Sequence, residues 1–394
     1  MVILYNPHID DFLGEPPHFR ILHRRPLKKY GFLISEMLAG QEPLRILFDA
    51  ELSAFLPNSV FSRLPRLMRR LIATVEFNVW CKLNRLSRAK VECVSTEHLS
   101  GDDTVLAFSY KAACGNFERR LAYFRRCRAV VFHLSHYFVA TREKSDNLRR
   151  LHNVFLAGDT DISDNFYFNR HFGWYQRPFL VLPFAVAPRF SCRIPYAERD
   201  AKCLATGSFH DLTREEPVHK YVDYITSSGL STYHPLRKAI FDAHKTLTDR
   251  IVCRISPFRD YDNINLVRRF ISHFNISQKN YFAQDIVSLY NQYRYAVVGE
   301  EWSGFPALGA LEAMACGALL IGHPNCFNGL DIFPDEHFVA HDGTLAGLLK
   351  VLSKIEFDKA RALAEAGRHE VASRFSSKSV YRRWLDELSK VGLS

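Results

Sequence analysis

Short apolar runs recur along the first half of the chain, and several of them end in polar or small residues. Some of these runs are separated by longer stretches with helical spacing, such as residues 61–88 and 116–127. Buried strands that alternate with helices are typical of a parallel sheet with helices on both faces. The pattern therefore predicts strands at 45–48, 105–108, 129–132, 153–156 and 179–182.

A proline-bearing segment, residues 182–200, interrupts this pattern, and the pattern then begins again. Prolines at 183, 188 and 195 are typical of a linker between domains. Beyond it we expect an apolar stripe along a C-terminal helical tail that starts near Asp358 and contains Val380, Trp384, Leu385 and Leu388. The second half predicts strands at 202–206, 250–255, 295–298, 318–321 and 337–339, with a helix near 284–294.

The length of the chain indicates its number of domains, and its net charge indicates the kind of partner that it binds. A chain of 394 residues exceeds the roughly 250–300 residues of a single core, so we expect two domains. The net charge of +10 suits anionic partners: nucleotide diphosphates, membrane surfaces or nucleic acid. Nine cysteines without metal-ligand spacing, no evident signal peptide and no apolar stretch of about 18 residues predict a cytoplasmic protein with reduced thiols.

The most informative segment is 296–322, AVVGEEWSGFPALGALEAMACGALLIG, which predicts a strand, a loop, a helix and a second strand. The loop leads to the N-terminus of the helix, where unpaired N–H groups and the helix dipole favour an anion such as a diphosphate. Glu312 lies about one and a half turns into this helix, where its carboxylate can reach the hydroxyls of a ribose. The alternative is an ordinary strand–helix–strand unit whose small residues pack the helix against the sheet.

LEAMACGALLIG resembles the donor-site element of GT-B glycosyltransferases, in particular the retaining families with an E-x7-E element. In those families the second Glu, followed by Ala-Met-Ala-x-Gly, binds the donor ribose, and Glu312 matches this position. Eight residues earlier this chain has Gly304, so the role of the first Glu passes to Glu301 as an assumption, and the expected proline is displaced to Pro306. The resemblance favours retention of configuration, which the displaced first Glu weakens.

The resemblance also implies the architecture. We expect an α/β GT-B chain with two Rossmann-like domains whose parallel sheets face a central cleft. The first domain, 1–188, would bind the acceptor, and the second, 189–375, the nucleotide sugar. The C-terminal helix, 376–394, would pack back on the first domain.

The same resemblance implies catalysis without a bound metal or other cofactor. The donor would lie against the second domain, with an Arg near the diphosphate to neutralise the leaving group. Arg254 is favoured over Arg214, Arg237, Lys238 and Arg259 because it directly follows an apolar run. The expected donor-binding residues are Glu312, Glu301, Ser303, Gly304, Phe305, Pro306, Ala307, Gly207, Ser208 and Arg254.

Candidate catalytic residues follow two predicted strands of the first domain. His133 and His136 come at and just after one strand end, where an imidazole can contact a sugar or move a proton. Asp159 and Asp161 follow the next, where a carboxylate can serve as base or nucleophile. The alternatives are hydrogen-bonded histidines without a chemical role, and aspartates that shape turns or cap helices.

Residues 164–178, DNFYFNRHFGWYQRP, alternate aromatic with polar side chains. Tyr167, Arg170 and Trp174 could form a platform on which an acceptor sugar stacks. Aromatic rings beside Arg could equally stack single-stranded RNA, and a packed loop is a third interpretation.

Residues 61–90 carry eight Arg or Lys and one acidic residue, Glu76, around regularly spaced apolar residues. A basic amphipathic helix can lie on an anionic membrane, here the inner face of a cell membrane. The alternative is a core-packed helix with a basic outer face.

Taken together, the sequence favours a glycosyltransferase that moves a sugar from a nucleotide-sugar donor to a glycan, glycolipid or other acceptor, in bacterial surface polysaccharide or glycoconjugate synthesis. One alternative is a nucleotide-sugar epimerase of the same fold, which needs no acceptor. Another is a non-catalytic basic protein that binds RNA or membranes. Nucleic acid is not the expected partner, because no RNA-recognition motif occurs in the sequence.

Overall fold

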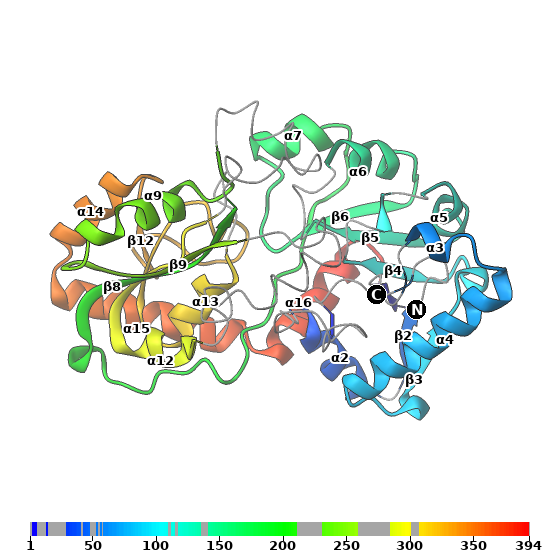
Figure 1. Ribbon diagram of the computed structural model, residues 1–394, viewed down its shortest axis with the longest axis horizontal. Helices are drawn as coiled ribbons and strands as arrows, with labels where there is room; N and C mark the ends of the chain where they lie inside the picture. Colours follow the sequence, from blue (N-terminus) through cyan, green and yellow to red (C-terminus); the bar gives the residue numbers. More distant parts are fainter. Residues whose placement is uncertain are drawn as a thin grey trace. The chain divides into compact units, whose positions relative to one another are not determined.

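The computed structural model describes residues 2–5, 13–14, 29–40, 42–47, 53, 56, 58–108, 112–114, 117–134, 141–210, 231–258, 284–300 and 307–393. The chain divides into two compact units (Figure 1). Unit 1 comprises residues 1–185 and 380–394, and unit 2 comprises residues 186–379. The first boundary, between residues 185 and 186, falls inside the proline-bearing segment.

Unit 1 is built on a parallel sheet in the strand order β3-β2-β1-β4-β5-β6-β7. Its central strands are buried along their whole length, as expected when helices cover both faces of a sheet. The strands are β1 (Val2–Tyr5), β2 (Leu44–Leu47), β3 (Val91–Val94), β4 (Thr104–Ala107), β5 (Ala129–His133), β6 (Val154–Gly158) and β7 (Leu180–Val181). Five of these strands match the predicted runs, whereas β1 and β3 were not predicted.

The helices of unit 1 connect these strands. In Figure 1, α6 and α7 lie on one side of the sheet, and α2 and α16 lie on the other. The helices are α2 (Gly31–Leu38), α3 (Asn58–Phe61), α4 (Arg66–Leu83), α5 (Phe117–Phe124), α6 (Thr141–Leu148), α7 (Phe166–Phe172) and most of α16 (Ser377–Lys390), with short 3₁₀ turns η1 (Arg88–Lys90) and η2 (Thr96–His98).

Unit 2 has a second parallel sheet, in the order β12-β11-β10-β8-β9. In Figure 1, α9 and α14 cover one face of this sheet, and α12, α13 and α15 cover the other. The elements are β8 (Asp200–His210), α9 (Pro235–Ala243), β9 (Ile251–Phe258), α12 (Ile286–Gln292), β10 (Tyr293–Val297), α13 (Leu308–Ala315), β11 (Leu319–Gly322), β12 (Val339–Ala340), α14 (Leu345–Lys354) and α15 (Phe357–Arg374), with 3₁₀ turns η4 (Tyr196–Glu198) and η5 (His244–Thr246).

The C-terminal tail is two helices rather than one. Helix α15 ends at Arg374, and α16 begins at Ser377. Val380, Trp384 and Leu388 of α16 are buried, whereas Leu385, also expected in the stripe, is exposed. The indole Nε1 of Trp384 donates a hydrogen bond of 2.7 Å to the carbonyl of Pro183. The end of the chain is thereby part of unit 1.

Candidate functional site

The strand–loop–helix–strand segment of unit 2 forms as predicted in the residues that the structure describes. Strands β10 and β11 are parallel neighbours, with Tyr295 opposite Leu319, and α13 connects them. Ala307 occupies the N-cap position of α13, so no N-cap side chain binds the N–H groups of the first turn. The predicted loop residues Glu301, Ser303, Gly304, Phe305 and Pro306 lie outside the described residues.

Glu312 lies in the second turn of α13, and its side chain is half-buried. Burial raises the pKa of its carboxyl to about 8, although the positive charge of Arg189 opposes this shift. At neutral pH the group is therefore largely protonated in the free protein. Hydroxyl groups that donate hydrogen bonds to it would favour the ionised form, which is the chemistry of a ribose-binding carboxylate.

Glu300 immediately precedes the predicted donor loop, and its side chain is buried inside unit 2. Its Oε1 accepts a hydrogen bond of 2.8 Å from the backbone N–H of His323, and its Oε2 lies 3.3 Å from Nε2 of His341. Burial alone would raise the pKa of Glu300, but the contact with His341 and nearby backbone N–H groups outweigh burial and lower it. Glu300 therefore joins the end of β10 to the ends of β11 and β12.

Gly207 and Ser208 were predicted in a turn after the first strand of the second domain, and this prediction is wrong. Strand β8 continues to His210, because its pairing with β9 extends from Cys203 opposite Ile251 to His210 opposite Phe258. Both residues are therefore within the strand. No local pattern indicated this extension, because Gly207 and Ser208 interrupt the apolar run.

Gly207 and Gly299 instead make room for Arg237, a buried residue of α9. Both glycines have positive φ, +124° and +64°, and a Cβ at either would lie 2.7 Å from the side chain of Arg237. The guanidinium donates from Nε to the carbonyl of Val298 and from Nη1 to the carbonyl of Ser208, each at 2.7 Å. Arg237 thus joins the carboxyl-terminal parts of β8 and β10, where parallel sheets bind ligands.

Arg254 does not lie at a strand end as expected. Strand β9 runs from Ile251 to Phe258, so Arg254 is in its interior, opposite Thr206. Its side chain is exposed on this edge strand. The apolar run marked only the first half of the strand, so the expected position at a strand end is wrong.

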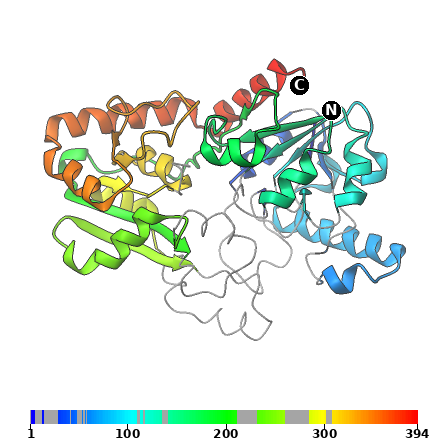
Figure 2. The same ribbon diagram turned by 90° about the horizontal axis from the view of Figure 1, so that it is seen from above.

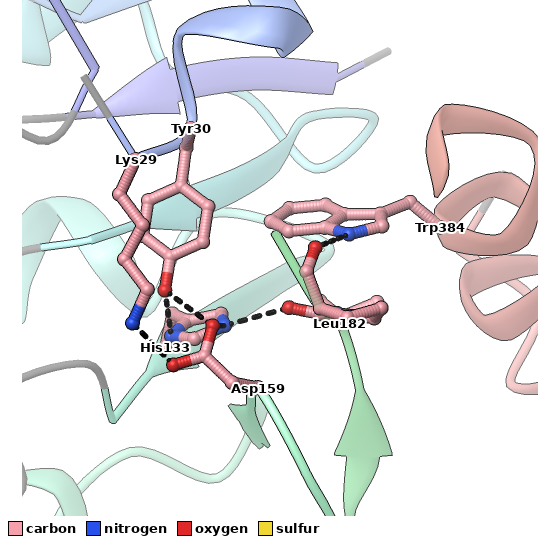
Figure 3. A network of polar contacts seen from close by, with 7 residues as sticks. Lys29, Tyr30, His133, Asp159, Leu182 and Trp384 are labelled. Atoms are coloured by element: carbon pink, nitrogen blue, oxygen red, sulfur yellow. Dashed lines mark hydrogen bonds and ion pairs between the residues drawn. The ribbon is translucent and has the colours of Figure 1, made fainter. Parts of the chain in front are cut away.

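Unit 1 holds a polar network at the carboxyl ends of β5 and β6 (Figure 3). Asp159 accepts hydrogen bonds from Lys29 Nζ at 2.5 Å and from the hydroxyl of Tyr30 at 2.8 Å. The same hydroxyl lies 3.4 Å from Nδ1 of His133. Asp159 and Lys29 each keep about 12% of their side-chain surface exposed. Sequence reasoning found His133 and Asp159 but missed Lys29 and Tyr30, which follow no apolar run.

His133 is buried beneath this network. Its Nε2 donates a hydrogen bond of 2.9 Å to the carbonyl of Leu182, and the indole of Trp384 stacks on its ring. Burial lowers the pKa of His133, although the charge of Asp159 and the bond to Leu182 oppose the shift. The ring has only 2% of its surface exposed, so direct contact with an acceptor does not fit this structure, which shows the hydrogen-bonded histidine that the sequence left open as an alternative. His133 packs against the ring of Tyr30, and its Nε2 lies 3.9 Å from Oδ1 of Asp159.

Asp161 shapes a turn. Its Oδ1 accepts hydrogen bonds from the backbone N–H and the hydroxyl of Ser163, at 2.9 and 2.6 Å. This is the turn-forming role that the sequence left open as an alternative. His136 lies outside the described residues, and no group of three or more His, Cys, Asp or Glu in the described part of the chain could hold a metal ion.

The expected acceptor platform does not form. Tyr167 is fully buried, with its hydroxyl 2.8 Å from that of Thr141, so its ring offers no stacking face. Trp174 lines a shallow cavity together with Val154, the first residue of β6, whereas Asp159 follows the last. Trp174 therefore lies near the amino end of β6, whereas Asp159 lies at its carboxyl end. Arg170 is exposed in the last turn of α7, and its role stays a prediction.

Helix α4 forms within the basic segment and has two apolar faces. Phe77, Trp80 and Cys81 lie on the buried face. On the outer face, large apolar side chains remain exposed at Leu67 (70%), Met68 (48%), Leu71 (58%) and Val75 (55%). Within the described residues, no helix is both long and apolar enough to cross a bilayer.

The chain is similar to one family model and to several solved structures. A family model described as "Glycosyl transferase-like" matches residues 237–386. Sucrose-phosphate synthase from Thermosynechococcus elongatus is similar at 13% identity and a TM-score of 0.53, with 99% of this chain and 98% of that chain covered. The Anabaena protein HepE, crystallised with UDP-glucose, is similar at 11% identity and a TM-score of 0.54, with 99% of both chains covered.

The chain has the GT-B fold. The expected fold class, α/β with two parallel sheets, is thereby confirmed. The family model covers less than half of the chain, mostly within unit 2. No curated protein matches the sequence at a significant level.

Proposed function

We propose that the chain is a glycosyltransferase that moves a sugar from a nucleotide diphosphate sugar to a glycan, glycolipid or other acceptor, in bacterial surface polysaccharide or glycoconjugate synthesis. Three observations support it: the GT-B fold, the glycosyl transferase-like match over residues 237–386, and similarity to HepE, which was crystallised with UDP and with UDP-glucose. At 11–13% sequence identity the structural similarity supports only the fold. The evidence for the function must therefore come from the residues of the site.

The single observation that carries the proposal is the position and state of Glu312. Its half-buried carboxyl lies in the second turn of a helix that connects adjacent parallel strands, and its pKa is raised to about 8. In this proposal Glu312 accepts hydrogen bonds from the ribose hydroxyls. The N-terminal turn of α13 and residues 303–307 bind the diphosphate.

On the acceptor side, Asp159 is the group we assign to contact the acceptor hydroxyl. Lys29 and Tyr30 hold its two oxygens in place, and residual exposure leaves it accessible. A carboxylate held in one orientation can accept the proton of an attacking hydroxyl. Catalysis without a bound metal, and retention of configuration, remain parts of the proposal that rest on the resemblance of the Glu312 segment.

The outer face of α4 favours peripheral contact with an anionic membrane. Leu67, Leu71 and Val75 follow one another at intervals of four residues, and Met68 lies beside them, so the exposed apolar side chains form a single strip. Arg66 and Arg70 flank this strip, although both also contact Glu97. An apolar strip beside arginines matches the interface of an anionic bilayer. We propose that the protein acts at the inner face of the cytoplasmic membrane on a lipid-linked acceptor.

The proposal is tested by incubating the purified protein with UDP-, GDP- and TDP-sugars, with and without acceptors extracted from bacterial membranes. A transferase produces a glycosylated acceptor and free nucleotide diphosphate only when both substrates are present. Conversion of the donor sugar without any acceptor would instead show an epimerase. Failure of every donor to bind, together with salt-sensitive binding to RNA, would favour the non-catalytic alternative.

A further inference from the structure

Unit 2 contains a cavity that takes no part in the proposed donor site. It has a volume of about 370 Å³ and lies among β12, α14 and the first turns of α15. Its lining comes from residues 335–363, which include neither α13 nor the ends of β8 and β10. In Figure 2, α14 and α15 are the orange helices of unit 2. Cavities of this size accommodate small organic ligands.

Three lysines line this cavity: Lys350 and Lys354 from α14, and Lys359 from α15. All three side chains are exposed, and none of them forms an ion pair with a residue that the structure describes. Lys350 and Lys354 are four residues apart on one helix, where like charges repel. Lys359 lies in the first turn of α15, where the helix dipole disfavours a cation. An anion bound in the cavity would relieve both unfavourable placements.

The remaining lining defines the chemistry of that anion. Val351, Ile355 and Leu363 supply apolar surface between the lysines. Two carboxylates, Asp335 and Asp342, also line the cavity, but Oδ1 of Asp342 is already bound by the backbone N–H and hydroxyl of Thr344 at 2.9 and 2.7 Å. With three lysines and two aspartates the lining has a surplus of one positive charge. The cavity therefore suits a small organic anion with an apolar body.

His341 connects this cavity to the segment that precedes the donor loop. It lines the cavity, its backbone N–H donates to the carbonyl of Gly322 at 3.0 Å, and its Nδ1 accepts from the N–H of Gly343 at 2.8 Å. The ring proton is therefore on Nε2, which lies 3.3 Å from Oε2 of the buried Glu300. Displacement of His341 changes the environment of Glu300, whose main chain leads directly into residues 301–306.

We propose that this cavity is an effector site for a small organic anion, such as a phosphate monoester with an apolar substituent, and that its occupancy alters donor affinity through His341 and Glu300. The binding part stands without the proposed function, whereas the coupling part rests on donor binding to unit 2. Because coupling between two binding sites is reciprocal, the donor must change the affinity of the effector by the same factor.

Binding is tested with phenyl phosphate as the probe, titrated into the full chain by NMR and calorimetry. We expect one saturable site, tighter for phenyl phosphate than for inorganic phosphate, and weakened at least tenfold in the Lys350→Glu/Lys354→Glu variant. The matched control is Lys245→Glu/Lys378→Glu, which makes the same charge change at exposed lysines outside the cavity. Equal weakening in both variants, or no weakening in the first, overturns the proposed site.

Coupling is tested by two readouts in the same titration. Phenyl phosphate should shift the ring resonances of His341, and it should change the Kd of UDP at least twofold in the wild type but not in His341→Gln. A bound probe that leaves the Kd of UDP unchanged in the wild type overturns the coupling, even if the His341 resonances shift, because His341 lines the cavity itself. If UDP binds under no condition, the proposed donor site fails by itself, and the His341 resonances still decide whether the cavity and His341 are linked.

Discussion

The indole of Trp384 stacks on the imidazole of His133, with ring centroids 5.9 Å apart and planes at 10° to one another. One residue comes from the C-terminal helix and the other from the end of β5, so α16 closes the floor of the polar network around Asp159. Tyr30 and Phe108 contact the same two rings. Together these rings bury the imidazole of His133, which is 2% exposed.

Replacing Trp384 with alanine should therefore destabilise unit 1 and change the titration of His133. We expect a loss of about 3–5 kcal/mol in the free energy of unfolding, because a fully buried aromatic side chain is removed. The pKa of His133, now lowered chiefly by burial, should rise toward its ordinary value as water enters. Chemical denaturation and NMR titration measure the two effects. Trp384→Phe, which keeps a stacking ring, should cause a smaller change in both.

Asp159 and Tyr30 should affect turnover more than stability. Asp159→Asn removes the carboxylate charge while keeping the shape of the side chain, and we expect kcat to fall by about 100-fold or more, as for the loss of a general base. Tyr30→Phe removes the hydroxyl that orients Asp159 and should cause a smaller loss. Steady-state kinetics on the identified substrates measure both values.

The control for these substitutions is Asp161→Asn, which also removes a carboxylate in the segment after β6. The amide oxygen of the substituted side chain can still accept the two hydrogen bonds from Ser163, so kcat should change less than threefold. A loss in Asp161→Asn that equals the loss in Asp159→Asn would contradict the assignment of Asp159.

Glu312 should lower stability as pH rises. Its pKa is raised from 4.5 to about 8 in the folded protein, so between these values the folded state holds a proton that the unfolded state releases. Stability that is present below about pH 4.5 is therefore lost progressively up to about pH 8. Glu312→Gln lacks this loss, so the stability of the variant should exceed that of the wild type by a margin that grows from pH 5 to pH 8, by up to about 1.4 kcal/mol for each pH unit. Urea denaturation at several pH values measures the difference, and a constant difference would show that the carboxyl is not desolvated.

The apolar strip on α4 should determine membrane binding. Leu67→Ser/Leu71→Ser/Val75→Ser removes three exposed apolar side chains without touching the buried face. We expect binding to vesicles of phosphatidylglycerol and phosphatidylcholine to weaken at least tenfold in co-sedimentation, because each buried apolar side chain contributes up to about 1.5–3 kcal/mol. Phe333→Ser, at another exposed apolar residue, is the control and should bind like the wild type.

The sequence predicted the sheets well where strands are buried, since runs such as Ala129–Phe132 and Ala318–Ile321 became β5 and β11 within one residue at each end. The prediction failed where the extent of a strand is determined by its pairing with a neighbouring strand and not by a run of apolar residues. Strand β8 extends through polar residues because β9 pairs with it up to Phe258, and β3 has exposed residues at two of its four positions.

For the candidate site, the sequence singled out Glu312 and Asp159 because each lies in a segment beside a predicted strand, and their roles stay predictions. It could not locate the residues that contact Asp159 and Glu300. Lys29 and Tyr30 reach Asp159 across about 130 residues of sequence, and His341 meets Glu300 only because β12 pairs with β11. Such contacts depend on the tertiary fold and leave no local pattern.

The most direct test of the central assignment is the affinity of UDP for wild type and Glu312→Ala, measured by calorimetry at pH 7. Loss of the charge-assisted hydrogen bonds to the ribose should weaken binding by about 1–3 kcal/mol, roughly 5- to 150-fold in Kd. Wild-type binding should also release protons, because bound ribose favours the ionised carboxylate. Glu365→Ala, at an exposed position of α15, should bind UDP like the wild type. Equal UDP affinity in wild type and Glu312→Ala would contradict the account.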